Sequence, residues 1–244
     1  DAVRTLAGED FKTIPATQAE HKAKPPERTA FALPPKNNGN RRVFAYLHRS
    51  RGIAAEIVNH CIKYDLLYED AQHHNAVFVG KDENNNARYA FLRGTLTDSH
   101  FRQEATGSDK SYGFFLRGSG KTLFVCEAAI DALSVATLRK FGGLDWKKDN
   151  YLALGGVTAS ERKLPVALER TLNNFSFKRV VLCFDNDAAG QTAARRIFTM
   201  LRQQFPENLE VRTCVPEVKD FNDQLCVKLQ NGKNSPSRGT RESN

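Results

Sequence analysis

The apolar run "VVLCF" at residues 180–184 leads into two aspartates, Asp185 and Asp187, that are separated by a single residue. A second apolar run, "TLFVC" at residues 122–126, leads into Glu127. On extended chain, side chains two residues apart point the same way and lie roughly 6 to 7 Å from each other. At about 6 Å and an effective dielectric near 20, two unit charges repel by roughly 3 kcal/mol. A raised pKa, a nearby base or a divalent cation must offset this repulsion.

The residues alone leave two interpretations of the acidic pair open. Carboxylate oxygens without histidine or cysteine are the ligands that Mg²⁺ and Mn²⁺ prefer, and Mg²⁺ commonly keeps several waters. Alternatively, Asp187 caps the helix that follows it, and Asp185 forms an Asx turn at the corner between strand and helix. The five cysteines lack CxxC spacing and the six histidines lack ligand spacing, so we expect no zinc site.

From about Lys121 onward, short apolar runs alternate with helical patterns. The runs lie at 122–126, 151–156, 179–184 and 209–215, and the helical patterns at 128–141, 161–175 and 188–205. This alternation predicts an α/β fold, with a parallel sheet that helices cover on both faces. Functional groups of such sheets collect at the carboxyl ends of the strands. If the runs before Glu127 and Asp185 form neighbouring strands, the three carboxylates face one crevice.

The upstream part of the chain has a different pattern. The stretches "RRVFAYLHRSRGI" and "AAEIVNHCIKYDLL" have apolar residues at helical spacing and predict two short helices around a turn at Arg51 and Gly52. The stretches "NAVFVG" and "ARYAFLRGT" flank "KDENNN" and predict an antiparallel hairpin, and "YGFFLRG" predicts another strand. We therefore expect a smaller α+β lobe with antiparallel strands before the parallel-sheet domain.

We divide the chain into four parts on this basis. Residues 1–28 have scattered charge and the stretch "AKPPER", which indicate a flexible N-terminal arm. Residues 29–117 form the upstream α+β lobe, 118–226 the parallel-sheet domain, and 227–244 a basic tail that we expect to be disordered. Because the first residue is Asp1 rather than Met, we interpret the chain as a segment of a longer protein.

The distribution of charge favours a polyanionic partner. The net charge is +8, from 36 basic and 28 acidic residues, and no acidic residue occurs between Arg28 and Ala55. A solvated helix face is the alternative explanation for this basic stretch. The candidate nucleic-acid-binding residues are Arg41, Arg42, Arg49, Arg51, Arg88, Arg93 and Lys110. No apolar stretch approaches the roughly 20 residues of a membrane span, and the N-terminus does not resemble a secretory signal, so we expect a cytoplasmic protein.

Three blocks of the sequence carry a resemblance to a known family. "LFVCEAAIDALS", "LALGG" and "VVLCFDNDAAGQTAARRI" resemble, in order and spacing, the signature blocks of the Toprim domain. That domain is shared by bacterial primases, topoisomerases and small nucleases. The upstream stretches "YLHRSRGI", "NAVFVGKDENNNARYAFLRGT" and "GSDKSYGFFL" resemble an uncharacterised domain that precedes Toprim in proteins of bacterial mobile elements. The resemblance implies that residues 118–226 form a Toprim-type sheet flanked by helices.

The resemblance also implies roles for individual residues. Glu127 matches the family's glutamate, a general acid or base and in some members a metal ligand, and Asp185 and Asp187 match its metal-binding pair. Asp131 matches an acid of the primase-like branch, although it can also cap the first turn of its helix. Four further matches concern the Gly turn after the second strand and a Lys-Asp step after the last: Gly155, Gly156, Lys219 and Asp220. Of these, Asp220 is a candidate metal ligand.

Three functions are compatible with this site. The first is primase-like nucleotidyl transfer in DNA replication, with Mg²⁺ or Mn²⁺ aligning a nucleoside triphosphate. The second is hydrolysis of phosphodiesters by a nuclease, and the third is a non-catalytic scaffold that binds DNA. The expected partners are nucleic acid, with DNA favoured over RNA, nucleoside triphosphates, and other replication or transfer proteins of a mobile element. The sequence has neither the zinc-binding module nor the helicase segment that bacterial primases usually carry, which argues against de novo priming by this segment alone.

Overall fold

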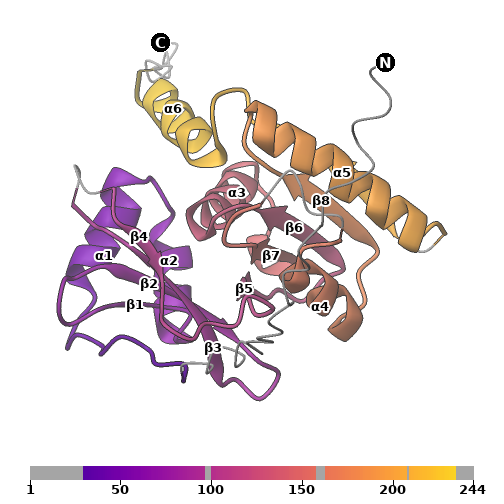
Figure 1. The fold of residues 1–244 in the computed structure, drawn as a ribbon. Helices are drawn as coiled ribbons and strands as arrows, with labels where there is room; N and C mark the ends of the chain where they lie inside the picture. Colours follow the sequence, from indigo (N-terminus) through magenta and orange to yellow (C-terminus); the bar gives the residue numbers. More distant parts are fainter. Residues whose placement is uncertain (1–29, 97–99, 158–162, 208, 235–244) are drawn as a thin grey trace, which may run out of the picture.

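The computed structural model describes residues 30–96, 100–157, 163–207 and 209–234. Two sheets organise them, a four-stranded sheet with the order β1-β2-β3-β4 and a five-stranded sheet with the order β5-β7-β6-β8-β9. Figure 1 shows the first sheet with helices α1 and α2 at the left of the molecule and the second sheet with helices α3, α4 and α5 towards the right, while α6 lies at the upper left. We call these parts the upstream lobe and the parallel-sheet lobe.

The four strands of the upstream lobe are antiparallel, and their bounds are Leu67–Glu69 (β1), Ala76–Lys81 (β2), Ala87–Arg93 (β3) and Arg102–Glu104 (β4). The predicted hairpin is therefore confirmed as β2 and β3, whereas β1 and β4 escaped prediction because each is only three residues long. A bulge interrupts the hairpin between Gly80 and Lys81. Gly80 is required there, because an added Cβ would lie 1.7 Å from the Tyr112 carbonyl oxygen.

The upstream helices pack on this sheet through one apolar face. Helix α1 spans Arg41–Ala45, continues as a π-helix over Tyr46–Ser50 (η1), and is followed by α2 over Ala55–Lys63. Gly52 separates them with a φ of 71°, in the left-handed region that glycine adopts at little cost. The predicted pair of short helices around this turn is confirmed. We call α1 and η1 together, residues 41–50, the basic helical segment.

The second sheet has the predicted parallel arrangement, with one exception at its edge. Its strands span Phe114–Leu116 (β5), Thr122–Cys126 (β6), Asp149–Ala153 (β7), Arg179–Cys183 (β8) and Glu210–Thr213 (β9). Strands β6 to β9 are parallel, and β5 pairs antiparallel with β7. The helices are α3 (Ala129–Phe141), α4 (Val166–Asn174), α5 (Ala188–Gln204) and α6 (Phe221–Asn234), with a short 3₁₀ turn, η2, at Trp146–Lys148.

Two hydrophobic cores cover the two faces of this sheet. On one face, α4 and α5 pack through residues such as Leu168 and Ile197 against Val125 and Leu182. On the other face, α3 and α6 pack against the alternate side chains of the same strands, and this core continues into the upstream lobe through Leu47 and other apolar residues. A single core thus crosses the predicted boundary near residue 118, which fixes the two lobes against each other.

Two predicted helix boundaries are wrong. Helix α4 begins at Val166 rather than at residue 161, because Pro165 disfavours helical geometry at the residue before it; residues 161 and 162 lie outside the described ranges. The tail predicted to be disordered from residue 227 is helical as far as Asn234. Its Leu229 packs on the core together with Phe221 and Leu225, at the helical spacing of four.

The arm predicted at residues 1–28 and the remainder of the tail, residues 235–244, lie outside the described part of the chain. Among the helices of the described residues, none has the length and apolar character that crossing a membrane requires.

Candidate metal and nucleic-acid site

Strands β6 and β8 bring Glu127 and Asp185 to the same edge of the sheet. The two strands are parallel, with Cys126 opposite Cys183, so Glu127 follows one residue after this pair and Asp185 two residues after it. The backbone N–H of Asp185 donates a hydrogen bond to Oε1 of Glu127 over 3.1 Å. The prediction that the two strands are neighbours is therefore confirmed.

Asp185 places one carboxylate oxygen in an unusual position. Its Oδ1 is buried and has no hydrogen-bond partner among the described residues. This oxygen therefore does not form the Asx turn considered as an alternative, and the backbone carbonyl of Asp185 accepts a hydrogen bond from Gln191 Nε2 over 3.1 Å. A buried carboxylate oxygen without a partner is costly in free energy unless a proton or a cation occupies the position beside it.

Asp187 has a structural role in addition to its charge. Strand β8 ends at Cys183, and Asp187 is the N-cap of α5, where its Oδ1 accepts the Gly190 N–H over 2.8 Å. Both aspartates therefore follow the end of the strand, in the connection to α5, and the helix-cap interpretation of Asp187 is confirmed. Gly190 is a residue that sequence reasoning missed: a Cβ there would lie 2.8 Å from Oε1 of Glu127.

Two further acids come close to this pair from α3 and α6. Asp131 is buried, with 8% of its surface exposed, and its Oδ1 accepts the backbone N–H of Asn222 over 3.3 Å. Its hydrogen bond therefore goes to α6 and not to the first turn of its own helix. Asp220 caps α6, because its Oδ1 accepts the Asp223 N–H over 2.7 Å.

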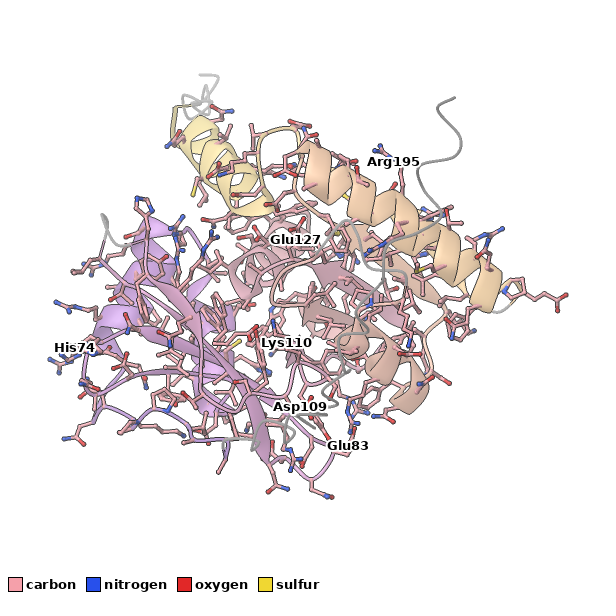
Figure 2. All side chains as sticks on the ribbon, viewed as in Figure 1. His74, Glu83, Asp109, Lys110, Glu127 and Arg195 are labelled. Atoms are coloured by element: carbon pink, nitrogen blue, oxygen red, sulfur yellow. The ribbon has the colours of Figure 1, made fainter. Side chains whose placement is uncertain are left out.

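These side chains border a cleft of about 460 Å³ between the two lobes. Glu127, Asp131 and Asp185 line it from the parallel-sheet lobe, together with the Gly turn. The residues that line it from the upstream lobe include Tyr89, Phe91, Arg102, Gln103 and Glu104. We call this space the acidic cleft. Figure 2 places Glu127 near the centre of the molecule, where the two lobes meet.

The Gly turn closes one side of the acidic cleft. Gly155 and Gly156 have φ angles of 74° and 107°, and their N–H groups donate to the Glu127 carbonyl over 3.0 and 3.1 Å. A Cβ on Gly155 would lie 2.4 Å from the Tyr89 hydroxyl oxygen. Glycine is therefore needed both for the backbone conformation and for the approach of the upstream lobe.

The electrostatic environment raises the pKa of three acids of the site, Glu127, Asp131 and Asp185. Burial, followed by the charges of Glu127, Asp220 and Asp187, raises the pKa of Asp185 to about 7. Burial, followed by the charges of Asp220 and Asp185, raises the pKa of Asp131 to about 8. The pKa of Glu127 is also raised, chiefly by burial. The common cause is that several carboxylates share one site of low solvent access.

The donor set fits a hard divalent cation. Over the described ranges no group of three or more His, Cys, Asp or Glu side chains is already arranged to hold a metal, in part because Asp187 and Asp220 cap helices. Mg²⁺ is commonly bound through one or two carboxylates and several waters, so Glu127 and Asp185 are sufficient. The unpartnered Oδ1 of Asp185 is the observation that supports this fit.

The seven candidate nucleic-acid-binding residues do not form one groove. Arg41, Arg42 and Arg49 are exposed on the basic helical segment. Arg51 is half-buried and binds Tyr46 and Asn222 through its guanidinium. The others lie elsewhere: Arg88 is stacked on Tyr112, Arg93 is half-buried in β3, and Lys110 forms an ion pair of 3.1 Å with Glu104.

Arg102 is the cationic residue of the acidic cleft, and sequence reasoning missed it. It lies on β4, opposite Arg93 of β3. The polar stretch around it gave no strand signal, and its position opposite Arg93 follows from strand pairing that the sequence does not show.

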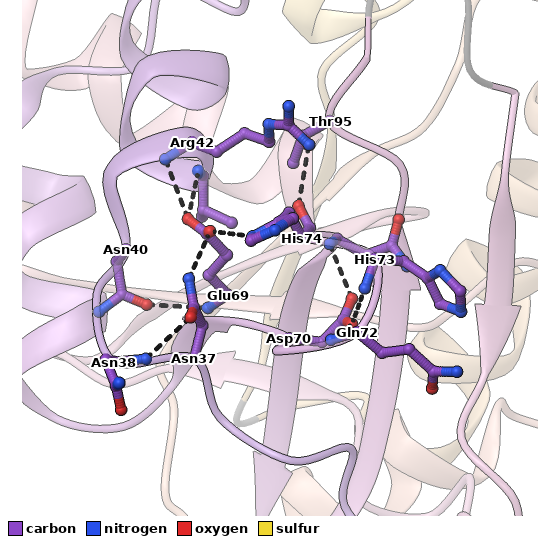
Figure 3. A network of polar contacts seen from close by, with 12 residues as sticks. Asn37, Asn38, Asn40, Arg42, Glu69, Asp70, Gln72, His73, His74 and Thr95 are labelled. Carbon is purple, nitrogen blue, oxygen red and sulfur yellow. Dashed lines mark hydrogen bonds and ion pairs between the residues drawn. The ribbon is translucent and has the colours of Figure 1, made fainter.

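A buried carboxylate holds the basic helical segment in place. Oε2 of Glu69 accepts the N–H groups of Arg42 and Val43 over 2.9 and 3.2 Å, at the start of α1. Its Oε1 contacts Asn37 Nδ2 and His74 Nδ1 at 2.8 and 2.7 Å. Figure 3 shows this network, in which Glu69 supplies the cap that the sequence of α1 lacks.

Comparison with known proteins agrees with this fold. Residues 124–225 match a family described as Toprim-like, and residues 45–121 match a family described as a protein of unknown function, DUF3991. None of the curated proteins matches the sequence.

Among solved structures, the primase fragment of the bacteriophage T7 primase-helicase protein is 26% identical, with a TM-score of 0.51, covering 76% of this chain and 70% of that chain. A DNA primase domain from Pseudomonas aeruginosa is 16% identical, with a TM-score of 0.46, and covers 82% of this chain and 61% of that chain. The DnaG primase catalytic domain bound to ssDNA is 15% identical, with a TM-score of 0.46, and 84% and 64% are covered. This chain thus spans less than two thirds of both of those primase domains.

The match over residues 124–225 and the parallel sheet with acids at its carboxyl edge show that this chain contains a Toprim-like domain. More particularly, a segment that matches the DUF3991 family, residues 45–121, precedes the Toprim-like segment, residues 124–225.

Proposed function

We propose that this protein carries out divalent-metal-dependent nucleotidyl transfer on nucleic acid, in the manner of a primase. The observation that carries the proposal is the acidic cleft, where a buried Asp185 oxygen without a hydrogen-bond partner lies among several carboxylates. The similarity of the chain to the primase fragment of the bacteriophage T7 protein supports the choice of reaction. The resemblance of the upstream part to mobile-element proteins favours DNA replication or transfer as the setting.

The residues of the acidic cleft would divide the chemistry between them. Asp185 and Glu127 would hold Mg²⁺ or Mn²⁺, with Asp187 as a third candidate ligand whose charge acts on Asp185. Asp131 and Asp220 would supply further negative charge beside them. The bound ion would neutralise charge on the phosphates and align them with an attacking hydroxyl. Glu127 lines the cleft and burial raises its pKa, so it is the candidate general acid or base of the site.

The basic residues would guide the nucleic acid toward this cleft. The exposed Arg41, Arg42 and Arg49 provide sequence-independent contacts with the phosphate backbone. Arg102 faces the acids from β4 and is placed to contact a phosphate of the bound substrate. Lys110 and Arg88 lie at the rim of the upstream lobe, each with an acidic or aromatic neighbour that limits its freedom.

Hydrolysis of phosphodiesters is the second candidate function, because the same acids can direct water instead of a hydroxyl group at phosphorus. The position of Arg102 opposite the acids serves either reaction. A non-catalytic DNA-binding scaffold is less compatible with the cleft, since replacing Asp185 or Asp131 by a neutral residue would relieve the mutual repulsion of the acids.

The decisive experiment is an extension assay. Primed single-stranded DNA is incubated with the protein, labelled nucleoside triphosphates and Mn²⁺, and the product lengths are compared with those for Asp185→Asn. Extension of the primer by the wild-type protein alone supports nucleotidyl transfer, and shortening supports the nuclease. If the DNA is bound in a salt-sensitive manner but neither product forms, the scaffold is the correct function.

A further inference from the structure

Asn222 is the second residue of α6 and is almost completely buried, with 3% of its surface exposed. Its side-chain amide uses both kinds of hydrogen-bonding atom. Nδ2 donates to the Arg51 carbonyl over 2.8 Å and to Ser134 Oγ over 3.0 Å, and Oδ1 accepts from Arg51 Nη1 over 3.3 Å. Asn222 therefore joins three elements: the turn after η1, helix α3 and the start of α6.

The backbone of the same residue reaches the acidic cleft. The N–H of Asn222 donates to Oδ1 of Asp131 over 3.3 Å, and Asp131 lines the cleft beside Glu127 and Asp185. The position of this N–H depends on the position of the first turn of α6. The buried side-chain amide of Asn222 fixes this turn against Ser134 and Arg51. The contacts thus form a chain from the basic helical segment, through Arg51 and Asn222, to a carboxylate of the cleft.

The chemistry of these contacts requires an amide at residue 222. An aspartate cannot donate to the Arg51 carbonyl or to Ser134, and leucine can neither donate nor accept. Alanine would leave buried polar atoms of Arg51 and Ser134 without these partners, which is costly in a site of low solvent access. The Asn222 side chain does not serve as a local helix cap, since its hydrogen-bond partners lie 171 and 88 residues away along the chain.

We propose that Asn222 is a positioning residue of the acidic cleft: it orients the Asp131 carboxylate toward a bound divalent cation and holds Arg51 beside the basic helical segment. The inference deepens the proposed function, because it rests on the cleft binding a cation. Partners that orient metal-binding groups typically change metal affinity by about 10- to 100-fold when they are removed.

The test is a double-mutant cycle read by calorimetric titration with Mn²⁺, with folding of each variant checked by circular dichroism. Asn222→Ala is expected to weaken Mn²⁺ binding by about 10-fold or more in the wild-type background. In the Asp131→Asn background the same substitution is expected to change the affinity by less than about twofold, since its effect acts through Asp131.

Leu229→Ala is the matched control. Leu229 packs α6 against the same turn, in contact with Gly52, but is not part of the Asn222 hydrogen bonds. It should therefore loosen α6 without changing Mn²⁺ affinity. The inference is overturned if Asn222→Ala leaves the affinity unchanged, if the loss is equal in both backgrounds, or if Leu229→Ala reproduces it. A wild-type protein that does not bind Mn²⁺ would instead overturn the proposed function, and this inference with it.

Discussion

At the scale of single residues, the acidic cleft contains a buried carboxylate oxygen without a hydrogen-bond partner among the described residues, and several acids whose charges repel each other. The Oδ1 of Asp185 is buried without a partner in the described part of the chain, and burial raises the pKa of both Asp185 and Asp131. Such an arrangement destabilises the ionised, metal-free protein. A cation bound in the cleft would stabilise the ionised carboxylates. Acids kept in a destabilising arrangement are therefore candidates for a functional site.

The raised pKa of Asp131 predicts a specific dependence of stability on pH. An aspartate in the unfolded chain has a pKa near 3.9, whereas that of Asp131 in the folded protein is about 8, so its ionisation destabilises the metal-free fold as the pH rises between these values. Asp131→Asn removes this contribution. We expect the variant to gain at least about 1 kcal/mol relative to wild type between pH 5 and pH 8.

Denaturant unfolding in the presence of a chelator, at both pH values, measures this difference. Because both proteins keep their other titrating groups, the comparison isolates Asp131. A difference in the free energy of unfolding that is the same at both pH values would show that Asp131 is not protonated in the folded protein near neutral pH.

Gly155 allows a second prediction at this scale, with a control that the chain itself provides. Gly155 and Gly143 have nearly the same φ angles, 74° and 76°, but a Cβ would meet the Tyr89 hydroxyl at 2.4 Å in the first case and nothing within 4 Å in the second. Gly143→Ala should cost about 1 kcal/mol from the backbone alone, and Gly155→Ala about 1 to 3 kcal/mol more. Tyr89→Phe should recover part of that excess in thermal unfolding. Equal costs for the two glycines would contradict the close approach of the lobes at this turn.

At the scale of elements, the sequence predicted most of the helices and strands whose apolar residues recur at regular spacing. The alternation of apolar runs and helical patterns predicted β6 to β9 and α3 to α5, and the acids at the ends of β6 and β8 predicted the site. The resemblance to the Toprim domain added Asp131, Asp220 and the Gly turn as candidates. The short strands β1 and β4 and the cleft residue Arg102 were missed, because three-residue strands have no measurable period and Arg102 comes to the cleft by tertiary pairing with β3.

Long-range hydrogen bonds were the other part that no pattern revealed. Glu69 caps α1 from a strand 27 residues away, and Asn222 meets Arg51 across 171 residues. Helix α6 was partly recoverable, since Phe221, Leu225 and Leu229 are spaced by four, but the polar residues between them indicated a tail. Asp187 comes three residues after the apolar run that ends at Phe184 and is already the N-cap of the next helix, one of the two interpretations that the sequence left open.

The Glu69 network predicts how the basic helical segment is held. Glu69→Ala removes the acceptor for the Arg42 and Val43 N–H groups and should destabilise the protein by about 1 to 3 kcal/mol. Hydrogen exchange should accelerate over residues 41–50. Asp70→Ala is the control, because Asp70 is buried beside it but accepts from the turn at Gln72, His73 and Asn75. Equal acceleration over residues 41–50 in both variants would contradict the role of Glu69.

At the scale of the whole molecule, both lobes contribute charged residues to a shared space. The parallel-sheet lobe contributes acids, and the upstream lobe contributes Arg102, Glu104 with its ion-pair partner Lys110 and, outside the cleft, the basic helical segment. One core connects the lobes, and an ion pair between Glu83 at the tip of the β2–β3 hairpin and Arg170 on α4 spans them at 2.7 Å. A polyanion that contacts the upstream lobe can therefore extend to a metal held by the other lobe.

This arrangement predicts where nucleic acid binds. Replacing Arg41 and Arg42 together by Glu should weaken binding of single-stranded DNA at low salt and reduce the slope of log affinity against log salt by about 1 to 2. The control is Arg195→Glu with Arg202→Glu, the same change of charge on exposed residues of α5, where Figure 2 places Arg195 away from the upstream lobe. Fluorescence anisotropy over a range of salt concentrations measures both. A control variant that loses as much affinity would show that net charge, and not the basic helical segment, determines binding.

The claim on which the whole account depends is that the acidic cleft binds a divalent cation, and calorimetric titration of the wild-type protein and of Asp185→Asn with Mn²⁺ tests it most directly. The account predicts saturable binding to the wild-type protein that is lost in Asp185→Asn, while the circular dichroism spectrum of the variant is unchanged. Equal Mn²⁺ affinity of the two proteins would contradict it.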